Sequence, residues 1–149
     1  MSTSPVLINS LVGLFGNVHG GSFPEAEIQV LLLTNAVTNG AAWAVAFHSF
    51  LALEEGIDAA DVAAIRDGRA PADPKRAALS VLAKTLIEKR GRIDDRDKQA
   101  FLAAGYGPDH LLEVVAVVAA STITNYTASV TQPPLEPAFQ PHAWHAPRS

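Results

Sequence analysis

The chain has 149 residues, no cysteine and a formal net charge of −4. This length fits one domain, and a hydrophobic content of 48 % is enough to bury a sizeable core. A chain without thiols forms no disulfide and offers no thiolate nucleophile. The mildly acidic balance, with no basic stripe to neutralise phosphates, excludes a nucleic-acid-binding protein.

Helical spacing of apolar residues, broken by glycine and proline, predicts an all-α fold without strands. The first element is a short apolar helix or turn, so the expected bundle has about six to seven helices. A capping box formed by Ser22 and Glu25 is expected to start the second element. The predicted ranges are 5–15, 24–38, 41–55, 58–66, 73–91, 94–104 and 109–129.

The chain reads as a single domain over residues 1–149, with two peripheral parts. Residues 1–22 form an N-terminal helix or turn, and residues 23–130 form the helical core. Residues 131–149 carry four prolines between positions 133 and 141, which favours an extended path over a helix. The apolar residues of this tail are expected to dock it onto a surface groove.

Residues 41–48 read Ala-Ala-Trp-Ala-Val-Ala-Phe-His, the layout of a C-x-x-C-x-x-x-H redox site without its sulfurs. In order and spacing, further segments extend this pattern from about Phe23 to Trp144. They are 56–68, 111–115, Asn125-Tyr126, Pro134-Leu135 and Phe139. Together they resemble the carboxymuconolactone decarboxylase and alkylhydroperoxidase D superfamily, peroxidase-related branch.

In members with peroxidase activity, a glutamate and a histidine move protons to a reactive cysteine pair. The resemblance places Gln29 at the glutamate position and Ala41 and Ala44 at the two cysteine positions, and it retains only His48. Thiol peroxidase chemistry by this polypeptide is therefore ruled out. Trp43 stands where an aromatic residue often lies between the cysteines, and it is a candidate substrate-binding residue.

His48 is the first candidate for a catalytic residue, although a histidine on such an apolar face is often only a hydrogen-bonded core residue. Gln29 could orient His48 or a ligand, but an amide is not a general acid or base near neutral pH. Glu25, one turn earlier on the same stripe, is a candidate proton acceptor. Its alternative role is to stabilise the start of its own helix.

Glu113 is a third candidate catalytic residue, because a carboxylate among Leu, Val and Ala can have a raised pKa. Its alternative role is that of a first-turn glutamate. Asn35 and Tyr126 are candidate substrate-binding residues that could donate hydrogen bonds to a carboxylate or carbonyl. Equally, such polar residues could satisfy one another at a subunit contact.

No metal site and no cofactor are expected. His142 and His145 are three residues apart in the proline-rich tail, without a nearby carboxylate or third histidine, and catalytic zinc generally needs three protein ligands. The longest apolar stretch, 111–123, contains Glu113 and hydroxyl residues, so it is expected to be a buried helix and not a membrane span. Residues 1–23 lack the basic start of a signal peptide, so a cytoplasmic location is the expectation.

Three functions remain open. The first is a cofactor-free decarboxylase or isomerase type of enzyme that acts on a small carboxylate or lactone near His48. The second is a non-catalytic small-molecule-binding protein or a degenerate subunit of a peroxidase-related family, and the third is a structural interaction module. In all three the resemblance implies a homo-oligomer, as a dimer, trimer or hexamer.

Overall fold

The computed structural model describes residues 4–147, and within them the fold is all-α, as predicted. Seven α-helices precede one short 3₁₀-helix, and no strand occurs in this part of the chain. The elements are α1 (Pro5–His19), α2 (Glu25–Thr38), α3 (Ala42–Glu54), α4 (Ala59–Arg66), α5 (Pro74–Glu88), α6 (Asp95–Ala103), α7 (Pro108–Thr131) and η1 (Pro137–His142).

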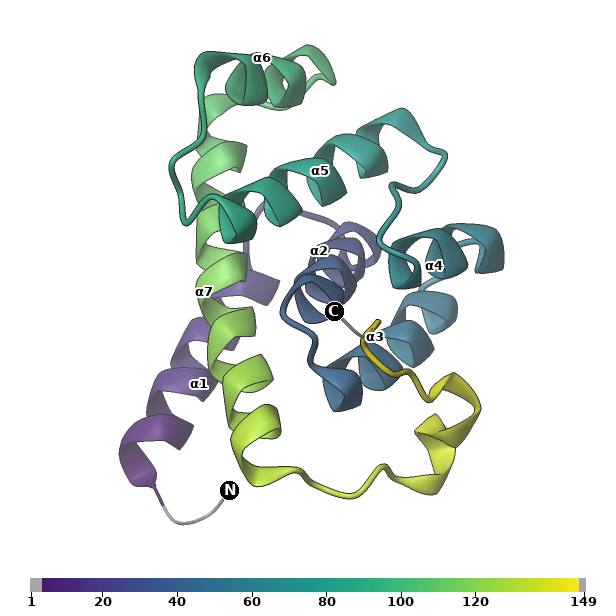
Figure 1. Cartoon of the computed structure of the whole chain (residues 1–149). Helices are drawn as coiled ribbons and strands as arrows, with labels where there is room; N and C mark the ends of the chain where they lie inside the picture. The colour runs from purple at the N-terminus through teal and green to yellow at the C-terminus, as the bar shows by residue number, and fades with distance from the viewer. Residues whose placement is uncertain (1–3, 148–149) are drawn as a thin grey trace.

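Helix α2 is the centre of the fold, because nine consecutive residues, 28–36, are buried. A helix that is buried on all sides has to be surrounded by other helices. It packs against α3, α4, α5 and α7, and Figure 1 shows it between these helices. The side chains that α2 carries are therefore fixed in the interior.

Two apolar cores lie on either side of α2. The larger joins it to α1, α5, α6 and α7 and includes Phe101, which stacks on Tyr106 at a ring-centre distance of 4.7 Å. The smaller joins α2 to α3 and α4 and includes Val45, Val62 and Ile65. The second core positions α3, which carries the retained histidine.

The start of the chain differs from the prediction. Helix α1 continues to His19 instead of ending near Phe15, because Gly16 lies within the helix and costs only about 1 kcal/mol there. The capping box at Ser22 and Glu25 does not form. Pro24 is the N-cap of α2 and makes no side-chain cap bond, while the carboxylate of Glu25 binds other side chains.

Helix α7 is longer than predicted and is not fully buried. By length and composition it could cross a membrane, and 28 % of its apolar stretch is buried. The expectation of a buried helix is thus wrong, while the expectation that it does not span a membrane stays a prediction. In the fold α7 runs along the edge of the bundle, with α1 beside it (Figure 1).

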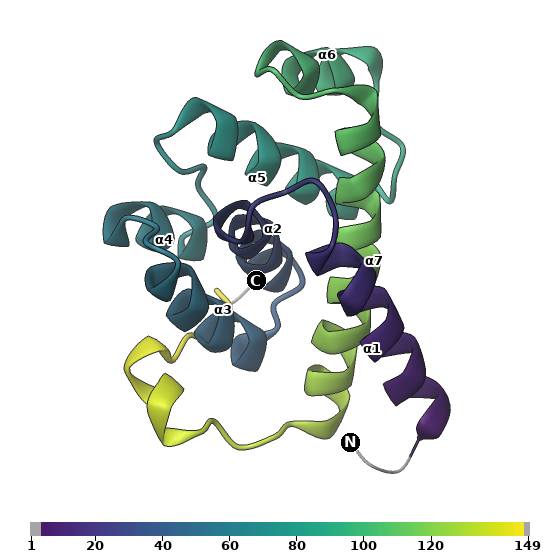
Figure 2. The ribbon, with the colours of Figure 1, turned by 180° about the vertical axis from the view of Figure 1, so that it is seen from behind.

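The tail, defined here as residues 132–147, leaves the end of α7 and crosses to α3, as Figure 2 shows from behind. It contains the 3₁₀-helix η1. The prediction of an extended path is therefore wrong for these residues, because the prolines permit short helical turns. Pro137 stands at the first position of η1, where its missing N–H costs nothing. Backbone hydrogen bonds close the two ends of η1: Phe139 N–H donates to Glu136 O, and Ala143 N–H donates to Gln140 O.

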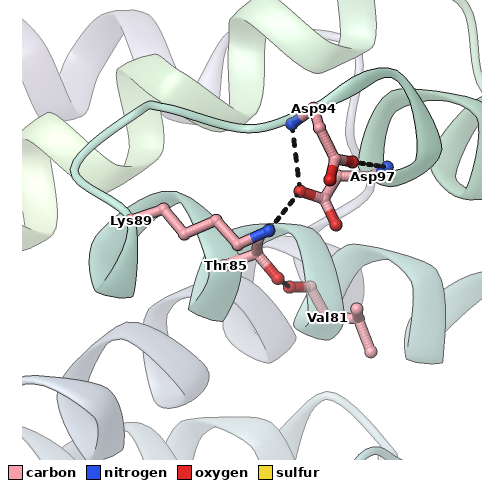
Figure 3. Close-up of polar contacts among 5 residues, drawn as sticks. All are labelled: Val81, Thr85, Lys89, Asp94 and Asp97. Atoms are coloured by element: carbon pink, nitrogen blue, oxygen red, sulfur yellow. Dashed lines mark hydrogen bonds and ion pairs between the residues drawn. The ribbon is translucent and has the colours of Figure 1, made fainter.

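The junction between α5 and α6 is fixed by side chains on the surface (Figure 3). The Asp94 carboxylate accepts the Asp97 N–H at 2.9 Å, and the Asp97 carboxylate accepts the Asp94 N–H at 3.1 Å, which makes a capping box. Lys89, at the end of α5, donates to Asp97 at 2.7 Å. This hydrogen bond raises the pKa of Lys89 and lowers the pKa of Asp97.

Replacing Asp94 by alanine should therefore destabilise the protein by about 1 kcal/mol, because the substitution removes the N-cap of α6. Asp95→Ala is the matched control, since the Asp95 side chain is 99 % exposed and caps nothing. Urea unfolding monitored by circular dichroism measures both variants. Equal unfolding free energies for Asp94→Ala and Asp95→Ala would contradict the assignment of the cap.

Candidate functional site

His48 is bound to Gln29, which the resemblance places at the glutamate position. His48 on α3 and Gln29 on α2 are both buried, and His48 Nδ1 lies 3.0 Å from Gln29 Oε1. The predicted orienting contact between these residues is therefore present. It lies where the central helix packs on α3.

A chain of hydrogen bonds continues from this pair to the surface. Gln29 Nε2 donates to Glu25 Oε1 at 3.3 Å, and His19 Nδ1 donates to Glu25 Oε2 at 3.0 Å. An ionised carboxylate only accepts, so it fixes the Gln29 amide with its NH₂ toward Glu25 and its oxygen toward His48. His48 must then carry its proton on Nδ1, and its Nε2 is an acceptor.

Burial keeps the His48 ring neutral. Its pKa is lowered to about 3, mainly because the charged ring would lose its hydration and secondarily because of the charge on His19. The amide between His48 and Glu25 does not pass protons in the way that a glutamate does. The chain of four side chains therefore orients the imidazole and does not relay protons.

The resemblance places Ala41 and Ala44 at the two cysteine positions, and both are buried in the core between α2 and α3. Ala41 is also the N-cap of α3 and lines a groove. The groove has a volume of about 350 Å³ and runs between the start of α3, the end of α7 and the start of the tail. Its lining residues are 40–43, Ala128, Ser129, Gln132 and Pro133.

An alanine at the N-cap leaves the start of α3 without a side-chain partner. The first amides of a helix have no acceptor within it and carry a partial positive charge. Because Ala41 and Ala42 line the groove, these amides lie beside it. Such an arrangement favours a carboxylate over a neutral or cationic group.

Further along α3, an aromatic cluster receives the tail. We define this cluster as Trp43, Phe47, Phe50 and Phe139. The Phe139 ring meets the other three edge-on, with ring-centre distances of 6.3, 5.2 and 5.3 Å. The Phe47 ring centre also lies 5.0 Å from that of His48, so Phe47 contacts both this histidine and Phe139 of the tail.

Polar contacts hold the tail at two further points. Trp43 Nε1 donates to Glu136 at 2.9 Å. The Arg66 guanidinium donates to His142 O at 2.8 Å and to Ala143 O at 3.0 Å, and Trp144 Nε1 donates to Arg66 O at 3.0 Å. The tail is thus fixed to the start of α3 through Trp43 and to the end of α4 through Arg66.

Glu113 does not join the chain of side chains at His48. It lies in the second turn of α7, so it is not a first-turn glutamate, and its Oε1 accepts the Ser22 N–H at 2.8 Å. A Cβ at position 21 would collide with this carboxylate, which explains the glycine there. Glu113 therefore fixes the turn between α1 and α2.

Asn35 and Tyr126 also lie apart from His48. Asn35 is buried and donates to the Ser121 hydroxyl at 2.8 Å, which joins α2 to α7. Tyr126 is 61 % exposed and lines a shallow groove with Asn39 and Thr122. Of the predicted residues, only Glu25 and Gln29 are joined to His48, whereas Trp43 borders the groove at α3.

Sequence reasoning missed three residues at this site, namely His19, Arg66 and Glu136. His19 belongs to no motif in the sequence, but the turn at residues 20–24 brings it back onto Glu25. The Gly20-Gly21 pair is the only signal of that turn. Among residues 4–147 no three histidine or acidic side chains are grouped so as to hold a metal ion.

No known family profile matches the sequence, and no curated protein matches it. Solved structures do share its fold. A complex of the debrominase Bmp8, in a cysteine-to-alanine variant, with 2,3,4-tribromopyrrole has a TM-score of 0.80 at 16 % identity, over 95 % of this chain and 77 % of that one.

Two peroxidase-related proteins of uncharacterised function are similar as well. The one from Silicibacter sp. TM1040 has a TM-score of 0.79 at 15 % identity, over 89 % of this chain and 71 % of that one. The one from Ralstonia eutropha JMP134, described as an alkylhydroperoxidase AhpD core, has a TM-score of 0.80 at 14 % identity, over 91 % and 74 %. The predicted resemblance is thus confirmed at the level of the fold.

The lowered pKa of His48 predicts how stability depends on pH. In the unfolded chain the ring titrates near pH 6.5, whereas in the folded protein it stays neutral down to about pH 3. Between these values the unfolded state binds a proton that the folded state does not, so stability decreases as the pH is lowered from about 6.5 toward 3, by up to about 1.4 kcal/mol per pH unit.

The variant His48→Gln should lose this part of the pH dependence, while His145→Gln, at an exposed tail position, should keep it. Urea unfolding at several values between pH 4 and pH 7 measures the slope. If His48→Gln kept the slope of the wild type, another group would be responsible for it.

Proposed function

We propose that this chain is a cofactor-free small-molecule-binding protein of the alkylhydroperoxidase D-like and carboxymuconolactone decarboxylase family, which has lost peroxidase chemistry. Its ligand is a small unsaturated carboxylic acid or a related lactone. The acid group binds at the start of α3, in the groove lined by Ala41 and Trp43. The chain has no cysteine to reduce a peroxide.

The observation that carries this proposal is the groove at a former cysteine position. Ala41 supplies neither a thiol nor a capping oxygen, so the amides of the first turn of α3 are left to a ligand. Trp43, half-buried at the same groove, supplies apolar surface for the body of the ligand. A volume of about 350 Å³ lies within the range of small-molecule sites.

A fold neighbour supports binding without a full set of cysteines. The Bmp8 variant in which a cysteine is replaced by alanine is in complex with 2,3,4-tribromopyrrole. A small ring compound can thus bind in this fold when a thiol has been removed. We transfer only the general class of ligand, a small unsaturated or aromatic molecule.

Binding is favoured over lyase-type catalysis because of the position of His48. The ring is buried and bound to Gln29, and it does not line the groove at α3. A ligand in the groove would therefore not touch the imidazole directly. His48 acts in this proposal as a positioning residue that fixes α3 on α2.

A second candidate function, assembly as a homo-oligomer or as a partner subunit, rests on α7. Five exposed residues at helical spacing form an uncharged stripe along this helix: Leu112, Val115, Ala119, Tyr126 and Val130. Large exposed apolar patches mark interaction sites. A second copy offers an identical stripe, so the two helices can pack about a two-fold axis.

Small unsaturated acids should raise the Tm of the wild type, because a ligand at 100 times its Kd stabilises by about 2.7 kcal/mol. Ala42→Glu places a carboxylate over the amides at the start of α3 and should remove the part of the shift that comes from the groove. Ala59→Glu, the same change at the start of α4, should keep it. Thermal unfolding with a panel of acids, lactones and quinone-like compounds measures this effect.

If no compound shifted the Tm of the wild type, binding would be rejected in favour of the structural role. If Ala42→Glu and Ala59→Glu responded equally, the ligand would bind elsewhere. His48→Ala should leave the Tm shift intact if His48 only positions α3. Incubation of the wild type with the bound acid should then leave the acid chemically unchanged.

Val115→Glu should convert the oligomer to monomer, because it places a charge in the apolar stripe of α7. Val81→Glu is the matched control, since Val81 is a valine of similar exposure, 51 % against 45 %, on α5. Sedimentation velocity measures the mass of each variant. A monomeric wild type, or equal masses for the two variants, would contradict the assembly through α7.

A further inference from the structure

A second cavity lies where the end of the tail meets the helical body, and it shares no lining residue with the groove at α3. Its volume is about 360 Å³, and it is bounded by α2, α4, the α4–α5 connection, α5 and the end of the tail. Small-molecule sites commonly have volumes of roughly 300 to 1,000 Å³. The cavity is thus large enough for a small organic molecule.

Its deeper part combines apolar surface with a pair of hydroxyls. Thr34 on α2 and Ser80 on α5 are both buried, and their hydroxyl oxygens lie 2.8 Å apart. The apolar lining comes from Val37, Ile65 and Trp144. This mixture suits a molecule with an apolar body and few polar groups.

Basic residues outnumber acidic residues in the lining of the cavity, whereas acidic residues outnumber basic residues in the whole chain. The chain has 15 acidic and 11 basic residues, but the cavity is lined by three basic and two acidic residues. They are Arg66, Arg69, Lys84, Asp67 and Glu88. A local surplus of positive charge in an acidic protein favours an anionic ligand.

Two of the three cations keep donors that no described contact uses. Lys84 Nζ donates to Gly68 O at 3.1 Å, and an ammonium group has three donors. Arg69 Nη2 pairs with Asp67 at 3.0 Å, which leaves further N–H groups of its guanidinium. Arg66 is different, because its guanidinium already binds the Ser49 hydroxyl and the tail.

We propose that this cavity binds a small organic monocarboxylate, with Lys84 and Arg69 on the carboxylate and the apolar body against Trp144. This site is independent of the groove at α3. The Trp144 indole also donates to Arg66 O at 3.0 Å. A ligand packed on this indole therefore holds the end of the tail against the body.

The two tryptophans of the chain allow a direct test, because Trp144 lines this cavity and Trp43 lines the groove at α3. Benzoate added to the ¹⁵N-labelled full chain should shift the indole N–H signal of Trp144 in a saturable way, whether or not the groove at α3 also takes benzoate and shifts the signal of Trp43. Benzamide, a neutral molecule of similar shape, should produce no saturable shift.

Lys84→Met keeps most of the length of the side chain and removes its charge, so it should weaken benzoate binding about tenfold. Lys98→Met, the same change on α6 at a position that does not line the cavity, should leave the affinity unchanged. No Trp144 shift at millimolar benzoate, equal binding of benzamide, or unchanged affinity in Lys84→Met would each overturn the proposal. A shift confined to Trp43 would also overturn it and would place the carboxylate in the groove at α3.

Discussion

The hydrogen bond between Gln29 and His48 crosses the buried contact between α2 and α3. A polar group buried without a partner costs several kcal/mol, so this pair fixes how the two helices meet. Glu25 fixes the orientation of the Gln29 amide, and the amide in turn fixes the His48 ring. The place of α3 then determines both the groove at its start and the aromatic cluster that receives the tail.

The same scaffold accepts alanine at the two positions where the resemblance places cysteines. Alanine suits a helix well, and Ala44 fills the core between α2 and α3 without a polar atom to satisfy. Ala41 is buried as well, and the first amides of α3 beside it have no side-chain cap. The fold is thus compatible with alanine at both positions.

The sequence predicted the helices well because apolar spacing and glycine breaks act over short distances. It failed where the outcome depended on distant partners. Glu25 was expected to cap its own helix, but the return of α1 brings His19 to its carboxylate. The short 3₁₀-helix of the tail could not be foreseen, because it depends on the fit of Phe139 to α3. Nor does hydropathy alone tell which face of α7 is covered.

The attachment of the tail through Arg66 has a consequence for how the protein can change over evolutionary time. Its guanidinium binds the carbonyl oxygens of His142 and Ala143, which every amino acid possesses. Mutations at these two positions therefore do not delete the acceptors. Substitutions at these two positions leave both bonds available, whereas loss of the Arg66 guanidinium removes them together.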